Sequence, residues 1–207
     1  MWLNLLPTPP PPDRDDGGAA QPSGEPDRLR RMGMWLFLAS LTTLFAPFLI
    51  AHLFMRIDAG QWPPGGLPPW PAALWLSTAL IIATSLAMEW AARALRSQGT
   101  AALRRALVVA TLLAVAFLAC QSYCWSRLFD QDYPFTLWRV AGFAWFFMVI
   151  HALHVIGGVA ALGLVIRNTS LGRYSRTRSA GVRHCASYWH FIDAVWLVMF
   201  TVMFLPV

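Results

Sequence analysis

The sequence predicts an all-α integral membrane protein: a bundle of five transmembrane helices, with the N-terminus in the cytoplasm and the C-terminus outside. Three observations support this fold class. The 207 residues are 57% hydrophobic and 13% charged, whereas soluble domains carry roughly 25% charged residues. Five apolar stretches reach the length of about 20 residues that a helix needs to cross a bilayer. All basic residues are arginines, and they gather between the apolar stretches.

The elements follow in order along the chain. Residues 1–31 are rich in proline, glycine and aspartate and have little apolar surface to bury, so they are predicted to form a disordered cytoplasmic tail. Residues 32–207 form the five-helix transmembrane domain. A proline-rich turn, "WPPGGLPPWP", separates its first two helices. The apolar windows place the helices at residues 34–55, 71–92, 106–125, 143–166 and 186–205.

Arginine placement predicts the orientation. Thirteen arginines lie in the N-terminal tail and in the loops that follow the second and fourth helices, which share one side of the membrane. The other side holds only Arg56, Arg127 and Arg139. Because positively charged loops stay in the cytoplasm, the N-terminus is predicted to be cytoplasmic. A basic chain also raises nucleic acid as a partner, but topology explains these arginines, so no nucleic-acid partner is expected.

Five ionisable side chains within the predicted spans form the candidate polar network: Glu89, His151, His154, His190 and Asp193. Such groups are costly in a bilayer and usually face the bundle interior with a partner. By helical rise, Asp193 lies about 4–5 Å to the cytoplasmic side of its helix centre, and His190 and Glu89 about 9–10 Å. We therefore predict a buried polar network in which Asp193 pairs with His154 or His190, and which Glu89 joins.

Two interpretations of this network remain open. His190 and Asp193 are three residues apart, so they share a helix face and can satisfy each other in a purely structural network. Chains of acids and histidines also mark proton paths through membranes. A proton-related role is therefore the alternative to a structural one.

A metal or haem site is disfavoured. His151 and His154 have the i, i+3 spacing of a shared ligand face, but membrane di-iron oxygenases need many more histidines than the five present. The small residues Gly157 and Gly158 instead indicate that a neighbouring helix approaches this segment closely.

A copper site at the two nearby cysteines is also disfavoured. Cys120 and Cys124 have the spacing of a binuclear copper motif, but that motif needs a histidine where this chain has Leu128, and it belongs to a soluble β-barrel. We expect the cysteines to act as small apolar residues. The chain is therefore predicted to bind no metal and no cofactor of its own.

Four stretches carry a resemblance to a known family: "GMWLFLAS" (33–40), "FLACQSYCW" (117–125), "HALHVIGG" (151–158) and "YWHFIDAVW" (188–196). In this order they resemble subunit III of the haem–copper oxidases, which include cytochrome c oxidase. They cover nearly the whole predicted bundle. The chain is similar to a divergent, five-helix form of that family.

The resemblance implies a non-catalytic subunit of a terminal oxidase in aerobic respiratory electron transport. Such a subunit lies in a bacterial-type inner membrane beside subunit I, and with it subunit II; haem and copper are expected in those partners. It stabilises subunit I, binds membrane lipids, and supports proton uptake or oxygen entry. Besides the polar network, the resemblance implies a set of motif residues that pack the helices: Trp35, Gln121, Gly157, Gly158, Trp189 and Trp196.

Two positions depart from the family pattern. The family typically has a glutamate directly after the serine of the first motif, where it is the expected partner of a histidine in the fourth helix; this chain has Leu41. A second glutamate usually precedes the "YWHF" tyrosine by five residues, and here it is Arg183. With Leu41 in place of the acid, we expect Asp193 or Glu89 to satisfy the histidines of the fourth helix.

Two other functions remain as alternatives. One is a subunit III-like accessory protein of a nitric oxide reductase, which has similar helices and motifs. The other is a small membrane transporter, although transporters often show broken helices or inverted repeats, whereas the apolar windows here are continuous.

Overall fold

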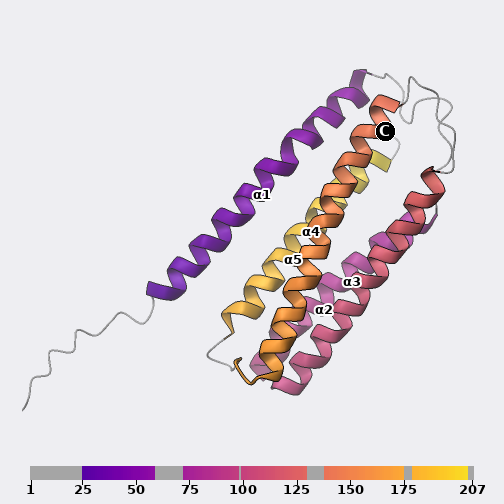
Figure 1. Cartoon of the computed structure of the whole chain (residues 1–207). Helices are drawn as coiled ribbons and strands as arrows, with labels where there is room; N and C mark the ends of the chain where they lie inside the picture. The colour runs from indigo at the N-terminus through magenta and orange to yellow at the C-terminus, as the bar shows by residue number, and fades with distance from the viewer. Residues whose placement is uncertain (1–24, 59–71, 98, 130–137, 175–178, 205–207) are drawn as a thin grey trace, which may run out of the picture.

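A computed structural model describes residues 25–58, 72–97, 99–129, 138–174 and 179–204, which form five long helices (Figure 1). All five are long and apolar enough to cross a membrane, which confirms the all-α, five-span fold class; the orientation of the termini stays a prediction. The helix bounds are α1 Glu25–Asp58, α2 Ala73–Ser97, α3 Thr100–Phe129, α4 Trp138–Ser170 and α5 Ala180–Phe204.

The helices are longer than the apolar windows that predicted them. Helix α1 begins at Glu25 and has Pro26 in its first turn, where proline is favoured because its missing N–H would have no helical partner. The predicted tail is therefore helical from residue 25 onward, and its residues 1–24 lie outside the described part of the chain. Hydropathy detects only the part of a helix that lies in hydrocarbon, so the arginine-bearing ends of the helices were missed.

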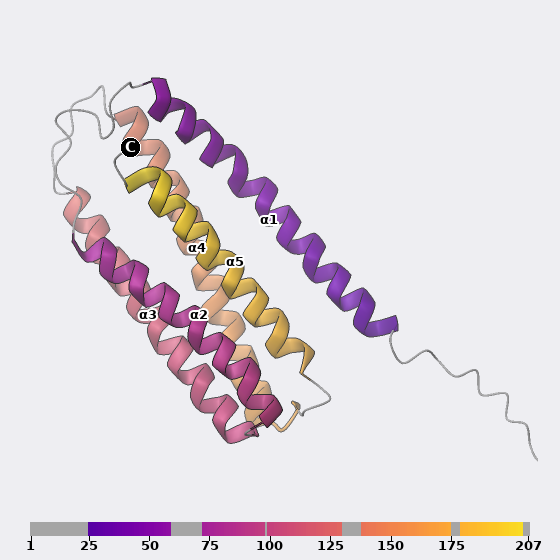
Figure 2. The same ribbon diagram turned by 180° about the vertical axis from the view of Figure 1, so that it is seen from behind.

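Helices α4 and α5 each contact three others: α4 contacts α1, α3 and α5, and α5 contacts α1, α2 and α4. Helices α2 and α3 form an antiparallel hairpin that turns at Gly99, whose φ of +88° is readily adopted only by glycine. Among the described helices, α1 contacts only α4 and α5. Figure 2 shows its N-terminal end leaning away from the other four helices. At its other end, Arg56 of α1 donates a hydrogen bond to the carbonyl of Val202 in α5.

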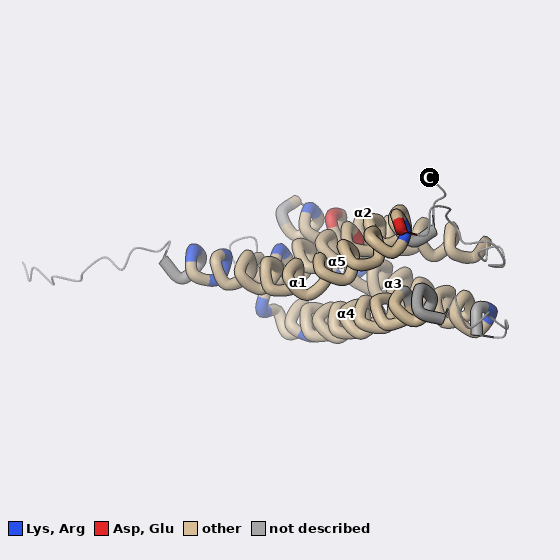
Figure 3. The backbone as a smooth tube through the Cα atoms, turned by 90° about the horizontal axis from the view of Figure 1, so that it is seen from above, with Lys and Arg blue, Asp and Glu red and all other residues tan. Residues whose placement is uncertain are grey.

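Apolar side chains lie on both the inside and the outside of the bundle. Trp189 and Trp196 of α5 are each 1% exposed and form part of the core, whereas Leu36 and Phe54 of α1 are exposed. Helices that are hydrophobic on all sides are typical of membrane spans. Charged residues lie mostly toward the ends of the helices (Figure 3), with Glu89 inside the α2 span and Asp193 inside the α5 span as exceptions.

Candidate functional site

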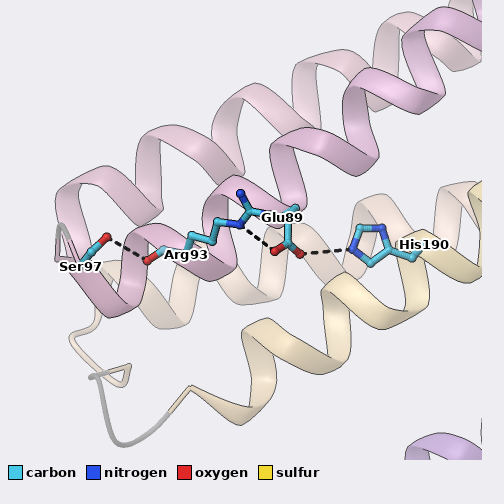
Figure 4. Close-up of polar contacts among 4 residues, drawn as sticks. All are labelled: Glu89, Arg93, Ser97 and His190. Atoms are coloured by element: carbon cyan, nitrogen blue, oxygen red, sulfur yellow. Dashed lines mark hydrogen bonds and ion pairs between the residues drawn. The ribbon is translucent and has the colours of Figure 1, made fainter.

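The main polar feature is a row of side chains along the contact between α2 and α5, here called the α2–α5 seam: Ser85, Glu89 and Arg93 of α2 and His190 of α5. The Glu89 carboxylate lies between two basic groups (Figure 4). Its Oε1 accepts a hydrogen bond from Arg93 Nε at 2.9 Å, and its Oε2 is 3.7 Å from His190 Nε2. Glu89 and Arg93 are four residues apart, so they share one face of α2.

Ser85 of α2 is a second partner of His190. Its hydroxyl oxygen lies 2.5 Å from His190 Nδ1, so both ring nitrogens of His190 face groups on α2. Asp193, three residues further along α5, is 4% exposed, and neither of its carboxyl oxygens has a hydrogen-bond partner among the described residues. The buried acid is therefore not hydrogen-bonded to this row of side chains.

These contacts correct the predicted network in two respects. First, the side chains of Glu89 and His190 are each 42% exposed, so they line the outside of the bundle. The buried stripe of α2 runs through Met88 and Ala91, and Glu89 lies to one side of it. Second, Asp193 makes no hydrogen bond with His154 or His190; the acid beside His190 is Glu89. Membership of a single functional network stays a prediction.

The second polar feature is His151 of α4, which is 1% exposed. Its ring is surrounded by aromatic rings from three other helices: Trp196 at 5.5 Å, and Phe45 and Phe117 at 6.4 Å each, between ring centroids. Neither ring nitrogen has a hydrogen-bond partner among the described residues. Gln121, predicted as a packing residue of the α3 motif, is likewise buried, at 3% exposed, with its amide unpaired among the described residues.

His154 is arranged differently from His151. Its Nδ1 is 2.8 Å from the carbonyl oxygen of Ile150 in its own helix. Its backbone carbonyl accepts a hydrogen bond from the Tyr188 hydroxyl of α5 at 2.8 Å. The side chains of His151 and His154 therefore contact different groups. Within the described ranges, no group of three or more histidine, cysteine, aspartate or glutamate side chains could hold a metal ion.

The predicted packing residues divide into buried and exposed. A Cβ atom at Gly158 would lie 2.9 Å from Trp189, so glycine is needed there; at Gly157 it would make only an ordinary contact of 3.8 Å with Tyr188. Trp35 is among the exposed ones, at 68% exposed with respect to the described residues. It lies near the N-terminal end of α1, the end that leans away from the other helices.

The indole of Trp196 has a specific polar partner as well as its aromatic neighbours. Its Nε1 donates a hydrogen bond to the Thr78 hydroxyl of α2 at 3.1 Å, and its ring lies edge-on to Phe117 of α3 at 5.4 Å. Because buried indole groups usually need such a partner, Trp196 fixes α5 against both α2 and α3.

Sequence reasoning missed two adjoining pockets at the end of the bundle predicted to face the cytoplasm. An apolar pocket of ≈470 Å³ lies between α1, α4 and α5, with Phe37 and Tyr188 in its wall. A smaller pocket of ≈360 Å³ is basic and is lined by Arg28, Arg31, Ala180, Arg183 and His184. His184 lines both pockets. The arginines that line the basic pocket are visible in the sequence, but there they were interpreted only as charges that flank the membrane spans.

Together the fold and the site define a multi-pass membrane helix bundle with two polar features, the α2–α5 seam and the buried side chain of His151. The sequence model of the family described as cytochrome c oxidase subunit III matches residues 27–206, so the match covers all five helices. The chain belongs to the cytochrome c oxidase subunit III family.

Individual relatives agree with this assignment. A cytochrome c oxidase subunit 3 of Synechocystis sp. is 32% identical over 184 residues, which is 88% of this chain and 77% of the relative. The protein of the same name from Thermostichus vulcanus is 28% identical over 180 residues, or 85% and 87% of the two chains. The human protein is 30% identical over 179 residues, or 82% and 67%.

Proposed function

We propose that the chain acts as the non-catalytic subunit III of a haem–copper terminal oxidase in aerobic respiration. It stabilises subunit I in the inner membrane of a bacterial cell, with subunit II in the same complex, and haem and copper are bound by those partners. The observation that carries this proposal is the family match over residues 27–206. The family model and the relatives named above carry the name of an oxidase subunit, and give no support to a nitric oxide reductase protein or a transporter.

The surface of α1 supports assembly with a membrane partner. The helix contacts only α4 and α5 among the described helices, and Trp35, Leu36 and Phe54 are each exposed over about two thirds of their surface. Because lipid tails are as apolar as these side chains, close packing with another helix, rather than hydrophobicity, decides which partner covers such a face. We propose that subunit I covers part of it.

The two adjoining pockets support a role in lipid binding. The basic pocket offers Arg31 and Arg183 to an anionic headgroup, and the apolar pocket beside it is open to an acyl chain. Basic pockets between membrane helices commonly bind anionic headgroups. Replacing both arginines by glutamine is expected to reduce the anionic phospholipid that copurifies with the complex, as measured by mass spectrometry of extracted lipids. The same change at Arg104 and Arg105 of α3, which do not line these pockets, is the matched control and should leave lipid content unchanged.

Copurification tests the main proposal. The tagged full-length chain, purified from native membranes in a mild detergent, should bring with it a haem-containing subunit detected by its absorption spectrum and by mass spectrometry. Purification of the chain without a haem protein but with stoichiometric iron or copper of its own would contradict the proposal. Copurification with a nitric oxide reductase would favour the alternative accessory role.

A further inference from the structure

We infer that the outer face of α5 is the docking site for a transmembrane helix of the haem-bearing partner, and that this helix supplies a hydrogen-bond donor to the Glu89 carboxylate. The inference rests on the proposed function, because it names a surface through which that partner is held. The outer face consists of five side chains of α5 that are exposed with respect to the described residues: Ser187, His190, Ala194, Leu197 and Thr201.

The outer face lies between two helices that do not touch each other. Helix α5 contacts α1 on one side and α2 on the other, and within the described ranges α1 and α2 make no contact. Figure 2 shows α5 in front of α4, with α1 and α2 to either side of it. A partner helix laid along α5 here would therefore meet α1 on one flank and α2 on the other.

Two ionisable groups at this surface lie at the depth of the hydrocarbon. Glu89 and His190 are inside the apolar spans of α2 and α5, within about 10 Å of the helix centres, whereas half of the hydrocarbon core is about 15 Å thick. Their side chains are each 42% exposed. Ionisable groups at such depths almost always face protein or water instead of lipid. Their exposure in the isolated chain therefore indicates that protein covers them in the complex.

The hydrogen bonds of Glu89 show what the covering helix must offer. Its Oε1 accepts a hydrogen bond from Arg93 Nε at 2.9 Å. Its Oε2 is 3.7 Å from His190 Nε2, which is too long for a hydrogen bond. Polar side chains commonly bond across transmembrane helices. A partner helix with a side-chain N–H or O–H at this depth is therefore complementary to Glu89 Oε2.

The shape of the outer face suits close helix packing. Its residues follow one another at intervals of three, four, three and four positions, which is the spacing of a helix that packs along its length against another helix. Ser187, Ala194 and Thr201 are small, and small side chains let two transmembrane helices approach closely. The spacing and the small side chains agree with the position of the exposed carboxylate.

A partner of different sequence fits this surface better than a second copy of the chain. Two copies related by a two-fold axis along the membrane normal present the same residues to each other. The unsatisfied acceptor of Glu89 would then face a second Glu89 at the same depth. A helix of another subunit can place a donor there, and the proposed function supplies the haem-bearing subunit as that partner.

Photo-cross-linking tests the docking site in the full-length chain. A photoreactive phenylalanine derivative is introduced in place of Leu197, and native membranes are irradiated. The expected product joins residue 197 to a transmembrane segment of the haem-bearing subunit, identified by mass spectrometry. Leu112 of α3 is the matched control, because it is an exposed leucine on a helix across the core from the outer face, where Phe117 meets Trp196. It should not reach the same segment.

A steric variant tests the same surface by copurification. Ala194→Trp places a large ring on the outer face, and the haem recovered per chain in mild detergent is expected to fall about tenfold or more. Ala116→Trp of α3 is the matched control and should keep the wild-type ratio. Both alanines are exposed and lie about three residues past the middle of their spans. Circular dichroism verifies that both variants retain their helix content.

A third variant tests the hydrogen bond and serves if Ala194→Trp does not fold. Glu89→Leu removes the acceptor and should also lower the haem recovered per chain. At a surface that faces lipid, the same change would leave recovery unchanged or improve it, since it removes a charge from hydrocarbon. Glu89→Gln keeps an acceptor oxygen and should retain more haem than Glu89→Leu.

Several results would overturn the inference. They are equal haem recovery in Ala194→Trp and Ala116→Trp, wild-type recovery in Glu89→Leu, and cross-links from residue 197 that reach only lipid or a second copy of this chain. Copurification of the haem subunit with cross-links from residue 112 alone contradicts the docking site and leaves the proposed function intact. Failure of the wild-type chain to bring a haem subunit with it contradicts the proposed function itself.

Discussion

The close packing of α4 against α5 is tested by Gly158→Ala. A Cβ atom at residue 158 would lie 2.9 Å from Cζ2 of Trp189 and 3.1 Å from Cε1 of Tyr188. Trp189 is 1% exposed, so its ring cannot swing aside without disturbing the core. Overpacking of this kind costs about 1–3 kcal/mol, whereas the change from glycine to alanine in a helix returns about 1 kcal/mol. The expected net loss in the free energy of unfolding is therefore about 0–2 kcal/mol.

Gly163→Ala is the matched control for this change. Gly163 is also in α4, but a Cβ atom there would meet nothing within 4 Å. Both variants share the gain in helix propensity, so the difference between their unfolding free energies isolates the contact with Trp189. That difference is expected to be about 1–3 kcal/mol, with Gly158→Ala the less stable. Gly157→Ala, with an ordinary contact at 3.8 Å, should resemble the control.

The assay is reversible unfolding of the purified chain in mixed micelles. Rising amounts of a denaturing detergent are added, and helix content is followed by circular dichroism. Equal stability of Gly158→Ala and Gly163→Ala would refute the argument, because it would mean that α4 and α5 separate at no cost. A loss in Gly163→Ala alone would show that the close approach lies elsewhere along α4.

Three further predictions use the same unfolding assay. Trp196→Phe keeps a ring but removes the N–H that bonds Thr78, and should lower the unfolding free energy by about 0.5–1.5 kcal/mol; no loss would show that this bond is not maintained. Tyr188→Phe removes the hydroxyl that bonds the His154 carbonyl and should lower the unfolding free energy by about 1 kcal/mol. Wild-type stability of this variant would contradict the prediction. Arg93→Gln should change stability by less than about 1 kcal/mol, because exposed ion pairs contribute little, and a larger loss would mean that the seam also holds α2 to α5.

The number of spans followed from hydropathy alone, because a bilayer requires about 20 apolar residues for each crossing. The ends of the helices did not. Helix α3 begins at Thr100 and α5 at Ala180, in both cases before the apolar window. Arg104, Arg105 and Arg183 lie in the first two turns of these helices, and arginine lowers hydropathy without breaking a helix. A sequence therefore predicts the part of a helix that lies in lipid more reliably than its full length.

The polar residues show what can and cannot be learned from a residue's predicted depth in the membrane, calculated from the helical rise. Glu89 and His190 have similar predicted depths, and the structure brings their side chains within 3.7 Å. The predicted depth could not show whether they point inward, because that depends on the rotation of each helix. Residues three positions apart differ by about 60° around a helix. That rotation separates His190, which is 42% exposed on its side chain, from Asp193, which is 4% exposed.

The glycines of the third motif, in α4, illustrate the same limit. Gly157 and Gly158 were both expected to admit a neighbouring helix, and adjacent residues cannot be separated by composition. Only Gly158 faces Trp189 closely enough to exclude a Cβ atom, because neighbouring positions on a helix are about 100° apart. The identity of the helix that approaches is a long-range property that no local pattern contains.

Position 41, where the family typically has a glutamate, holds a leucine in this chain. Leu41 is buried at 7% exposed, and we expected Asp193 or Glu89 to take over as partner of the α4 histidines. Among the described residues, Glu89 faces His190 and Asp193 makes no hydrogen bond, and the expectation itself stays a prediction. His151 is instead enclosed by aromatic rings. In the described part of the chain, the acid that lies beside a histidine is therefore Glu89, at the α2–α5 contact.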